Sequence, residues 1–392
     1  MTTLPTIDGA LALVLERAQA LAPEDVPVAR AAGRVVAEPA AALVDLPPFD
    51  SSAMDGYAVR AEDTPGPLTV VGHSAAGKPE QRELGPGEAI VISTGAVVPA
   101  GADAVVPVER TTGEVDVEAV AAGENIRPRG GDARAGDVVV ERGDVLRPPQ
   151  LGALAAAGVA SIRCARRPRV AVLATGTELR APGETLAPGE IYESNTVLLR
   201  AQLESVGAEV TVLDAVRDDE DATRVALEQG LEFDMLVTSG GVSVGPHDLV
   251  RAALASLAVE EVFWRVAVRP GKPIAFAMRG ATLVFGLPGN PVSSLVGFEL
   301  FVRPALLALQ GASEPRPAYL PGKLAATLRR NEHRDDLVRA RSHIEDGAVV
   351  LEPLTGQESH MIVRSAAASA LVLVPRGAGE LTAGARVSYL RI

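Results

Sequence analysis

The stretch Asp234–Asp248, DMLVTSGGVSVGPHD, constrains the fold more than any other part of the chain. An apolar run enters it, the triplet Ser239–Gly241 follows at once, and Asp248 opens the helically periodic run LVRAALASL. A strand that turns through glycines onto a helix start directs several backbone N–H groups at one spot and leaves room for a ligand. In open α/β sheets, ligands bind at these carboxyl ends of strands. The turn therefore predicts an anion site formed by Ser239, Gly240, Gly241 and Ser243, although a tight turn without a ligand explains the stretch equally well by itself.

The chain around this stretch alternates between strand-like and helix-like periods. The apolar runs RVAVLAT, AEVTVLD and DMLVTSGG are separated by the helical patterns NTVLLRAQLESVG and DEDATRVALEQG. This β-α-β-α-β order predicts a parallel sheet in a three-layer α/β domain, which we assign to residues 169–311. Polar residues gather at its strand ends, namely Glu178, Asp218, the loop up to Asp248, and the turn GLPGNP, in which Asn290 and Pro291 start a long helix.

The remaining segments predict three further units. Thr6 precedes a helical run, and the alanine-rich segment from Arg147 to Cys164 also reads as a helix, so residues 1–50 with 147–168 form an expected discontinuous helical domain. Short apolar runs between Gly/Pro turns predict an inserted, mostly β domain over residues 51–146. Beyond Gly311 the β pattern returns, with a hairpin signal at Asp346-Gly347, and predicts a small C-terminal β-barrel over residues 312–392.

Composition excludes several classes of function. The 392 residues carry 37 basic and 50 acidic side chains, a net charge of −13, and 3% aromatics, which disfavours a nucleic-acid partner. Cys164 is the single cysteine, and the five histidines show no zinc-ligand spacing. No basic, apolar leader and no 18-residue apolar run occurs, so we expect a soluble, cytoplasmic protein without a membrane segment.

The expected inserted domain holds polar loops that a fold alone does not require. The loop DSSAMDGYA contains Asp55, the turn STG contains Thr94, and the turn RGGD contains Asp132. Loops that concentrate such groups often carry function, although an Asx-turn leading into a strand is the simpler alternative for the first of them. The segment GHSAAGKP imitates a phosphate-binding loop, but Pro79 stands where the Ser/Thr hydroxyl is needed, so we reject that interpretation.

Carboxylates surround the predicted anion site. Glu178, Asp218 and Asp248 all follow strands of the same sheet. Acidic groups beside an anion are favourable when a hard cation bridges them, and Mg²⁺ with a phosphate ligand is the natural choice. The alternatives are a helix N-cap for Asp248 and a partner of the helix dipole for Glu178.

Taken in order, the segments DSSAMDGYAV, STGAVVPAGADAVVPVE, SGGVSVGPHD, RPGKP and GLPGNP resemble the MoeA family of molybdopterin molybdenumtransferases. The gephyrin E domain is a eukaryotic relative of that family. The resemblance covers nearly the whole chain. It implies a homodimer of elongated four-domain subunits with sites shared between subunits. The implied reaction inserts molybdate into adenylylated molybdopterin and releases AMP and molybdenum cofactor, with Mg²⁺ or a similar divalent cation.

The resemblance also implies roles for residues at matching positions. Arg265 and Arg269 stand where the family commonly has lysine, whereas Lys272 is retained, and arginine keeps the charge that an oxyanion needs. The implied catalytic residues are Asp55, Thr94, Glu178, Asp218 and Asp248, and the implied metal ligands are Asp55, Asp132, Glu178 and Asp248. The implied substrate- and oxyanion-binding residues are Arg265, Arg269, Lys272, Pro288, Pro291, Arg339 and Ser359, to which the strand-end loops add Asn290.

Two other functions stay open. The α/β domain is also similar to molybdopterin adenylyltransferases, which make the adenylylated substrate, but those are short single-domain chains. A non-enzymatic molybdopterin-binding scaffold would not need the set of carboxylates. An adenylyltransferase and molybdoenzyme targets are the protein partners that the resemblance implies.

Overall fold

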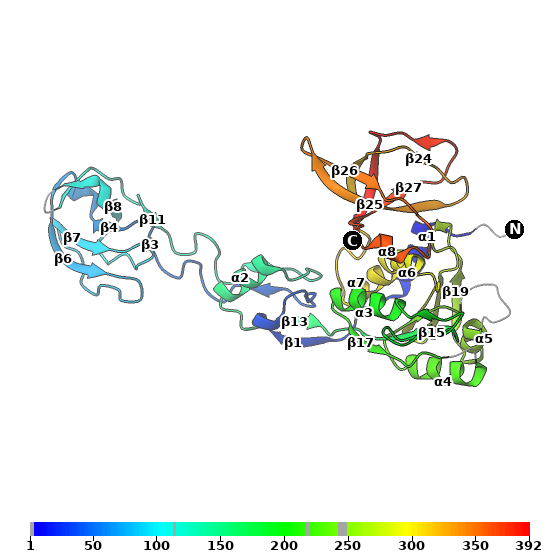
Figure 1. The fold of residues 1–392 in the computed structure, drawn as a ribbon. Helices are drawn as coiled ribbons and strands as arrows, with labels where there is room; N and C mark the ends of the chain where they lie inside the picture. The colour runs from blue at the N-terminus through cyan, green and yellow to red at the C-terminus, as the bar shows by residue number, and fades with distance from the viewer. Residues whose placement is uncertain (1–3, 113–114, 217–218, 242–248) are drawn as a thin grey trace.

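In the computed structural model, which describes residues 4–112, 115–216, 219–241 and 249–392, the chain forms an extended molecule. A small β unit lies at one end, and an α/β unit with a C-terminal barrel lies at the other (Figure 1). A narrow unit, through which the chain passes twice, joins the two ends. This arrangement separates the polar loops of the inserted unit from the strand ends of the α/β unit.

The α/β unit contains a six-stranded sheet in the order β17-β14-β18-β22-β21-β19. Strands β17 (Glu209–Val212), β14 (Arg169–Ala174), β18 (Met235–Ser239) and β22 (Thr282–Leu287) run parallel, as predicted. Strand β21 (Ala275–Arg279) runs antiparallel to both β22 and β19 (Glu260–Trp264), so the sheet is mixed on one side. The four parallel strands end at one edge, and that edge carries the predicted site.

Helices cover both faces of this sheet. Helices α4 (Glu220–Gly230) and α5 (Leu249–Ser256) pack against one face with Ala171, Leu173 and Leu236. On the other face lie α3 (Asn195–Ser205) and the continuous run α6 (Pro291–Gly297), a π-helical turn (Phe298–Val302) and α7 (Arg303–Leu309). Side chains alternate across each strand, so one apolar strand supplies both cores. This confirms the expected three layers.

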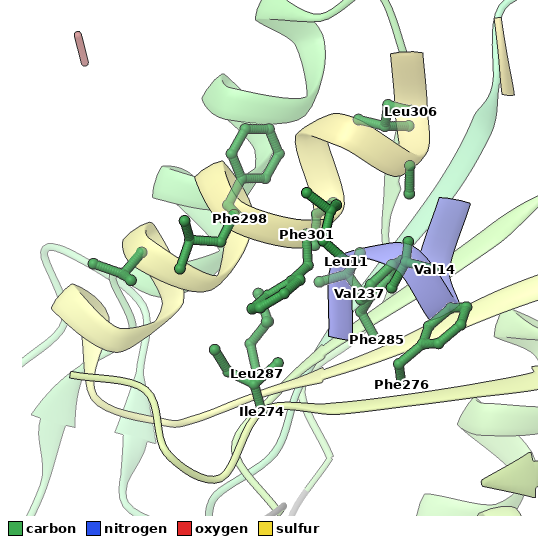
Figure 2. Packing of buried hydrophobic residues seen from close by; sticks show 14 of the residues in the cluster. Leu11, Val14, Val237, Ile274, Phe276, Phe285, Leu287, Phe298, Phe301 and Leu306 are labelled. Atoms are coloured by element: carbon green, nitrogen blue, oxygen red, sulfur yellow. The ribbon is translucent and has the colours of Figure 1, made fainter. Parts of the chain in front are cut away.

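Helix α1 (Ile7–Arg17) packs with the α/β unit, although the sequence suggested a separate helical domain for it. Figure 2 shows Leu11 and Val14 of this helix among Phe276, Phe285 and Phe301. Thr6 caps the helix as predicted, because its hydroxyl accepts a hydrogen bond from the Gly9 N–H at 3.0 Å. An amphipathic helix needs an apolar partner, and its own sequence does not say which core supplies it.

The joining unit is built from both passes of the chain. Strand β1 (Pro23–Pro27) pairs with β13 (Ser161–Ala165), and β2 (Ala40–Ala41) pairs with β12 (Val138–Val140). Helix α2 (Pro148–Ala156) closes their small core. The helix predicted over 147–164 therefore ends early, since Gly158 adopts φ +83° and the residues beyond it form a strand. The discontinuous unit exists as expected, but strand pairs share its core with a single helix.

The inserted unit contains a four-stranded sheet in the order β6-β7-β4-β8 and a small sheet of β5 (Gly66–Pro67), β10 (Asp116–Val117) and β9 (Thr111–Thr112). The strands of the larger sheet are β6 (Thr69–Ser74), β7 (Glu88–Ile92), β4 (Gly56–Val59) and β8 (Ala104–Pro107). The short pair β3 (Ser51–Ser52) and β11 (Ile126–Arg127) connects it to the joining unit. Only Gly fits at position 56, because a Cβ there would lie 2.0 Å from the Val106 carbonyl oxygen.

The C-terminal unit is a closed five-stranded barrel, as predicted. Strands β25 (Asp335–Glu345), β26 (Ala348–Pro353), β23 (Leu320–Leu324), β29 (Arg386–Arg391) and β27 (Ala370–Val374) pair in a ring. The Asp346-Gly347 turn joins β25 to β26, and both of its residues have positive φ. Strand β20 (Val268–Arg269) leaves the α/β unit and pairs with Asp335 and Asp336 of β25, which joins the two units along a seam.

Among the described residues, one helical segment, Pro291–Leu309, is long and apolar enough to cross a membrane by composition. It is 83% buried in the α/β core, so in this fold it serves as a core helix.

Candidate functional site

Three parallel strands end side by side at the edge that the sequence singled out. Ala174 is in register with Ser239, and Ser239 is in register with Leu287. The chain then turns through Gly240 and Gly241, whose φ values are +92° and +66°. A Cβ on Gly240 would lie 2.7 Å from the Thr175 carbonyl oxygen, so this close passage of two loops requires glycine.

These strand ends open into a cavity of about 610 Å³, which we call the strand-end cavity. Glu178, Ser239, Gly241 and Pro288 line it, together with Asn195 at the start of α3. The Asn195 amide nitrogen donates to the Ser239 hydroxyl and to the Gly289 carbonyl, both at 2.7 Å. Its side-chain oxygen is buried and has no hydrogen-bond partner among the described residues. The cavity therefore offers a buried acceptor beside backbone groups that glycine leaves uncovered.

The GLPGNP turn forms the wall of this cavity. The Ser294 hydroxyl donates to the Pro288 carbonyl at 2.6 Å, and Pro291 occupies the first turn of α6. The Asn290 amide donates to the Ser359 hydroxyl at 2.9 Å, while the Ser359 carbonyl accepts from the Val292 N–H at 3.1 Å. A loop of the barrel is thus fastened to the helix start of the α/β unit.

A second cavity of about 610 Å³, the seam cavity, lies between the α/β unit and the barrel. Its lining includes Arg269, Lys272 and Arg334, and the acidic groups Asp336 and Glu358. Arg269 forms an ion pair with Asp336, whose side chain is only 3% exposed. Burial raises the pKa of the Asp336 carboxyl, and the Arg269 guanidinium opposes that rise. Lys272 and Arg334 have no ion-pair partner within the described ranges, so their charge is available to an anion.

The two cavities adjoin. Pro273, Pro288, Asn290 and His360 line both of them, and Ser359 lines the seam cavity beside His360. The structure thus brings together, at this one junction, the residues predicted from the strand-end loop, the RPGKP segment and the GLPGNP turn. A large ligand in the strand-end cavity and a small anion in the seam cavity would therefore lie next to each other at this junction.

Arg265 is a predicted cation that the structure places away from both cavities. Its guanidinium lies over the Trp264 ring, 3.9 Å from the centroid, and its φ is +76°. Arg265 lines neither the strand-end cavity nor the seam cavity. Stacking on an aromatic face is a structural use of a guanidinium, and the oxyanion contact predicted for Arg265 stays a prediction that its position outside both cavities does not support.

Arg339 also differs from its prediction, because it is 0% exposed and lines neither cavity. Its guanidinium donates to the carbonyls of Met361 and Gly356 and to the Ser365 hydroxyl, each at 2.7 Å. These acceptors belong to the loop that carries Ser359 and His360. These hydrogen bonds suit Arg339 to positioning the wall of the cavities, and the oxyanion contact that the resemblance implied for it stays a prediction.

The predicted residues of the inserted unit lie far from both cavities. The Asp55 carboxylate accepts a hydrogen bond from the Thr94 N–H at 2.8 Å, and both residues are exposed. Asp132 is exposed in the stretch that leads back from the inserted unit. Figure 1 shows β3 and β4, which flank Asp55, at the opposite end of the molecule from β15 (Leu179–Arg180), which follows Glu178. We call the inserted unit and the joining unit together the arm. Within one chain, the described site residues of the arm and those of the six-stranded sheet do not form one site.

Three predicted residues, Asp218, Ser243 and Asp248, lie outside the described residues. Among the residues that are described, no three acidic, histidine or cysteine side chains gather into a metal site. The described carboxylates alone therefore do not supply three ligands to one Mg²⁺ ion, and the predicted ligand Asp248 lies outside the described residues.

Sequence reasoning missed Asn195, Arg334 and His360. Asn195 is the first residue of a helix beside the predicted strand-end edge, a position that favours a functional amide. His360 directly follows the predicted Ser359, and a scan of the neighbours of predicted residues would have found it. Arg334 carried no signal, because only the pairing of β20 with β25 brings it to Lys272.

Comparisons with known proteins agree with this arrangement. Family models match three consecutive parts of the chain: "MoeA N-terminal region (domain I and II)" over residues 5–158, "Probable molybdopterin binding domain" over 171–308, and "MoeA C-terminal region (domain IV)" over 321–392.

The chain is 38% identical to molybdopterin molybdenumtransferase 2 of Mycobacterium tuberculosis, with 96% of each chain covered. It is 36% identical to molybdopterin molybdenumtransferase of Haemophilus influenzae, with 91% of each covered. It superimposes on a solved structure of the molybdopterin biosynthesis MoeA protein of Pyrococcus horikosii with a TM-score of 0.82, 30% identity and 99% coverage of both chains. These matches show that the chain belongs to the MoeA family.

Proposed function

We propose that this protein is a molybdopterin molybdenumtransferase, which inserts molybdate into adenylylated molybdopterin and releases AMP. The observation that carries the proposal is the common wall of Pro273, Pro288, Asn290 and His360 between the strand-end cavity and the seam cavity. The reaction joins a large adenylylated pterin to a small dianion. Two adjoining cavities, one with glycine loops and one with cations, suit those two substrates.

The residues of the chain have distinct tasks in this proposal. The turn Ser239–Gly241 and the Asn195 amide hold the pterin substrate, since they present uncovered backbone groups and a buried acceptor. Lys272, Arg269 and Arg334 attract and orient the oxyanion. Asn290 and Ser359 keep the common wall in place through their hydrogen bond of 2.9 Å. Positioning and charge thus supply the catalysis, without a covalent intermediate on the protein.

We further propose that the working form is a homodimer in which the arm of one subunit closes over the sheet of the other. Asp55 and Thr94 form a pre-built, exposed pair that lines neither the strand-end cavity nor the seam cavity of its own chain. Glu178 and Glu193 line the strand-end cavity of the sheet, but the Glu193 carboxylate already accepts hydrogen bonds from the Asn195 and Thr196 N–H groups at 2.7 and 2.9 Å. Assembly in trans would bring these acidic groups together, with Asp132 near the base of the arm. A divalent cation, Mg²⁺ or similar, would then have its oxygen ligands and would neutralise charge on the phosphoanhydride when bound.

The same proposal places the protein in the cytoplasm, between two classes of partner. An adenylyltransferase must supply the adenylylated pterin, and molybdoenzymes must take up the product. Measuring AMP release from adenylylated molybdopterin, with Mg²⁺ and molybdate, tests the reaction. A chain that instead forms adenylylated molybdopterin from ATP is an adenylyltransferase, and one that does neither is a scaffold.

A mixed dimer tests the shared site. Asp55→Ala and Glu178→Ala subunits should each be inactive alone. If the site is built in trans, a heterodimer contains one site with both changes and one with neither. Each heterodimer should therefore have up to about half of the activity of a wild-type dimer. If the site lies within one subunit, every site carries one change and no activity returns. A fluorescently labelled subunit must first show that the subunits exchange, and an inactive mixture after exchange would refute the shared site.

A further inference from the structure

A third cavity, on the outer side of the barrel, collects positive charge in a chain whose net charge is −13. It measures about 410 Å³, and we call it the arginine cup. Its charged or titratable lining residues are Arg269, Arg329, Arg330 and His333, with Glu332 as the single acid among those described. Neither the family comparison nor the proposed reaction uses this cavity.

The walls of the arginine cup are held by hydrogen bonds between two barrel loops. The Arg330 guanidinium donates to the carbonyls of Pro375 and Arg376, at 3.0 and 2.6 Å. A Cβ on Gly377 would lie 2.5 Å from an Arg330 nitrogen, so glycine makes room for the guanidinium at that point. The Asn331 side chain accepts from the His333 N–H at 3.0 Å, which closes the turn below. These contacts fix the cup before any ligand arrives, so binding would cost little conformational entropy.

Two guanidiniums remain available to a ligand. Arg329 is exposed, and within the described ranges its side chain has no ion-pair or hydrogen-bond partner. Arg269 is anchored on one side by Asp336, yet 54% of its side chain stays exposed. Arg269 also lines the seam cavity, where Lys272 and Arg334 lie. The arginine cup and the seam cavity therefore share a cation, and positive groups continue from one to the other.

We infer that the arginine cup binds a tetrahedral oxyanion and supplies it to the seam cavity across Arg269. A strongly acidic protein repels a dianion at long range, so a local cluster of cations is needed to raise its concentration near the site. Guanidiniums bind oxyanions through paired N–H donors, and a pre-built cup with a single acid suits such a ligand. The identification of this oxyanion with molybdate rests on the proposed function, whereas the binding site itself does not.

Binding is measured first, without any reaction. Tungstate serves as the probe, because it is a tetrahedral dianion and scatters X-rays anomalously. A crystal soaked in tungstate should show an anomalous peak in the cup, beside Arg329 and Arg269. In solution, calorimetry should show tungstate affinity falling about fivefold in Arg329→Gln, as expected for removing one charge a few ångström from a dianion in a hydrated site. Arg329→Lys should keep most of the affinity.

The matched control is Arg341→Gln, which removes the same charge from an exposed position further along β25 of the same barrel. It should leave the tungstate affinity unchanged. Titrations with phosphate and sulfate distinguish the sources of the anion: preference for tungstate and molybdate supports delivery to the reaction, and equal or stronger phosphate binding overturns delivery in favour of a phosphate site. In the AMP-release assay, Arg329→Gln should raise the KM for molybdate.

Several results would overturn the inference. A peak confined to the seam cavity would show that the cup binds nothing. A peak in the cup together with equal affinities of wild type and Arg329→Gln would mean an adventitious ion only. If Arg329→Gln and Arg341→Gln lowered the tungstate affinity equally, the loss would come from the change in net charge and not from a site in the cup. If the wild-type protein binds tungstate in the cup but releases no AMP, the proposed reaction fails while the oxyanion site stands.

Discussion

Replacing Arg339 by methionine tests whether this residue positions the loop of the two cavities or binds the oxyanion itself. Methionine fills a similar volume but removes all the donors. The wild-type guanidinium donates to the carbonyls of Met361, Gly356 and Glu358 and to the Ser365 hydroxyl, at 2.7, 2.7, 3.2 and 2.7 Å. All four acceptors belong to the segment 356–365. The substitution should therefore loosen that segment before it affects anything else.

The size of the effect follows from these contacts. Each lost hydrogen bond to a buried acceptor costs about 1 kcal/mol net, which gives about 4 kcal/mol for the four acceptors. Burial disfavours the charged guanidinium and lowers the pKa of Arg339. The cost of desolvating this charge in the folded protein therefore offsets part of the stabilisation by the hydrogen bonds. We therefore expect the free energy of opening the segment to fall by about 3 kcal/mol, which corresponds to roughly 100-fold faster amide exchange.

Hydrogen exchange of the 356–365 amides measures this loosening directly, and AMP release at varied molybdate measures its consequence. Arg339→Met should raise both the exchange rates and the KM, because Ser359 and His360 lose their fixed positions. Arg339→Lys should recover part of both, and Arg341→Met, an exposed change on the same strand, should alter neither. If Arg339→Met lowered oxyanion affinity while exchange stayed slow, the arginine would be a direct ligand and the positioning role would be wrong.

Three further outcomes follow from particular contacts. Burial raises the pKa of Asp234, but the Arg166 guanidinium, at 2.6 and 2.7 Å, and a backbone N–H outweigh burial and hold that pKa below its usual value. Its stabilisation is present above the unfolded pKa of about 4 and is lost as the pH falls through the folded pKa, so Asp234→Asn should flatten the acid decline of the Tm in calorimetry. Gly56→Ala places a Cβ 2.0 Å from a carbonyl oxygen of β8 and should destabilise the inserted unit by about 2 kcal/mol, seen as an earlier unfolding transition. Lys272→Met should raise the KM for molybdate, whereas Arg265→Met should leave it near the wild-type value and change tryptophan fluorescence instead.

The α/β unit was predictable because its signals are local. Each apolar run is short enough for one strand, and each helical pattern spans two or three turns, so order alone implied the parallel sheet. The cap at Thr6 and the turn at Asp346-Gly347 were equally local, since each depends on a few adjacent residues. The antiparallel pairing of β21 with β22 is also local, because only Gly280 and Ala281 connect the two strands, and so short a connection cannot join parallel neighbours.

Other features depended on contacts that the sequence does not encode locally. Helix α1 has an apolar stripe that suits several cores, and only packing against α7 decides between them. The alanine-rich run after Arg147 favours a helix throughout, but the pairing of Ser161–Ala165 with β1 overrides that preference. The sequence also does not tell what each arginine contacts. In the fold, Arg265 stacks on an aromatic ring, Arg269 lines a cavity, and Arg339 donates hydrogen bonds to a loop.

The geometry of Asp55 supports the proposal that the site is shared between two subunits. An exposed carboxylate gains little by holding a neighbouring backbone N–H, since water would satisfy both groups. The loop nevertheless fixes Asp55 at both ends: its carboxylate accepts from the Thr94 N–H at 2.8 Å, and its carbonyl accepts from the Val108 N–H at 3.1 Å. Fixing a charged side chain at the end of a long arm adds nothing to the stability of that arm. A fixed carboxylate loses less entropy when another surface binds to it. In the homodimer that we propose, this surface is the acidic strand-end cavity of the second subunit, joined to Asp55 through a divalent cation.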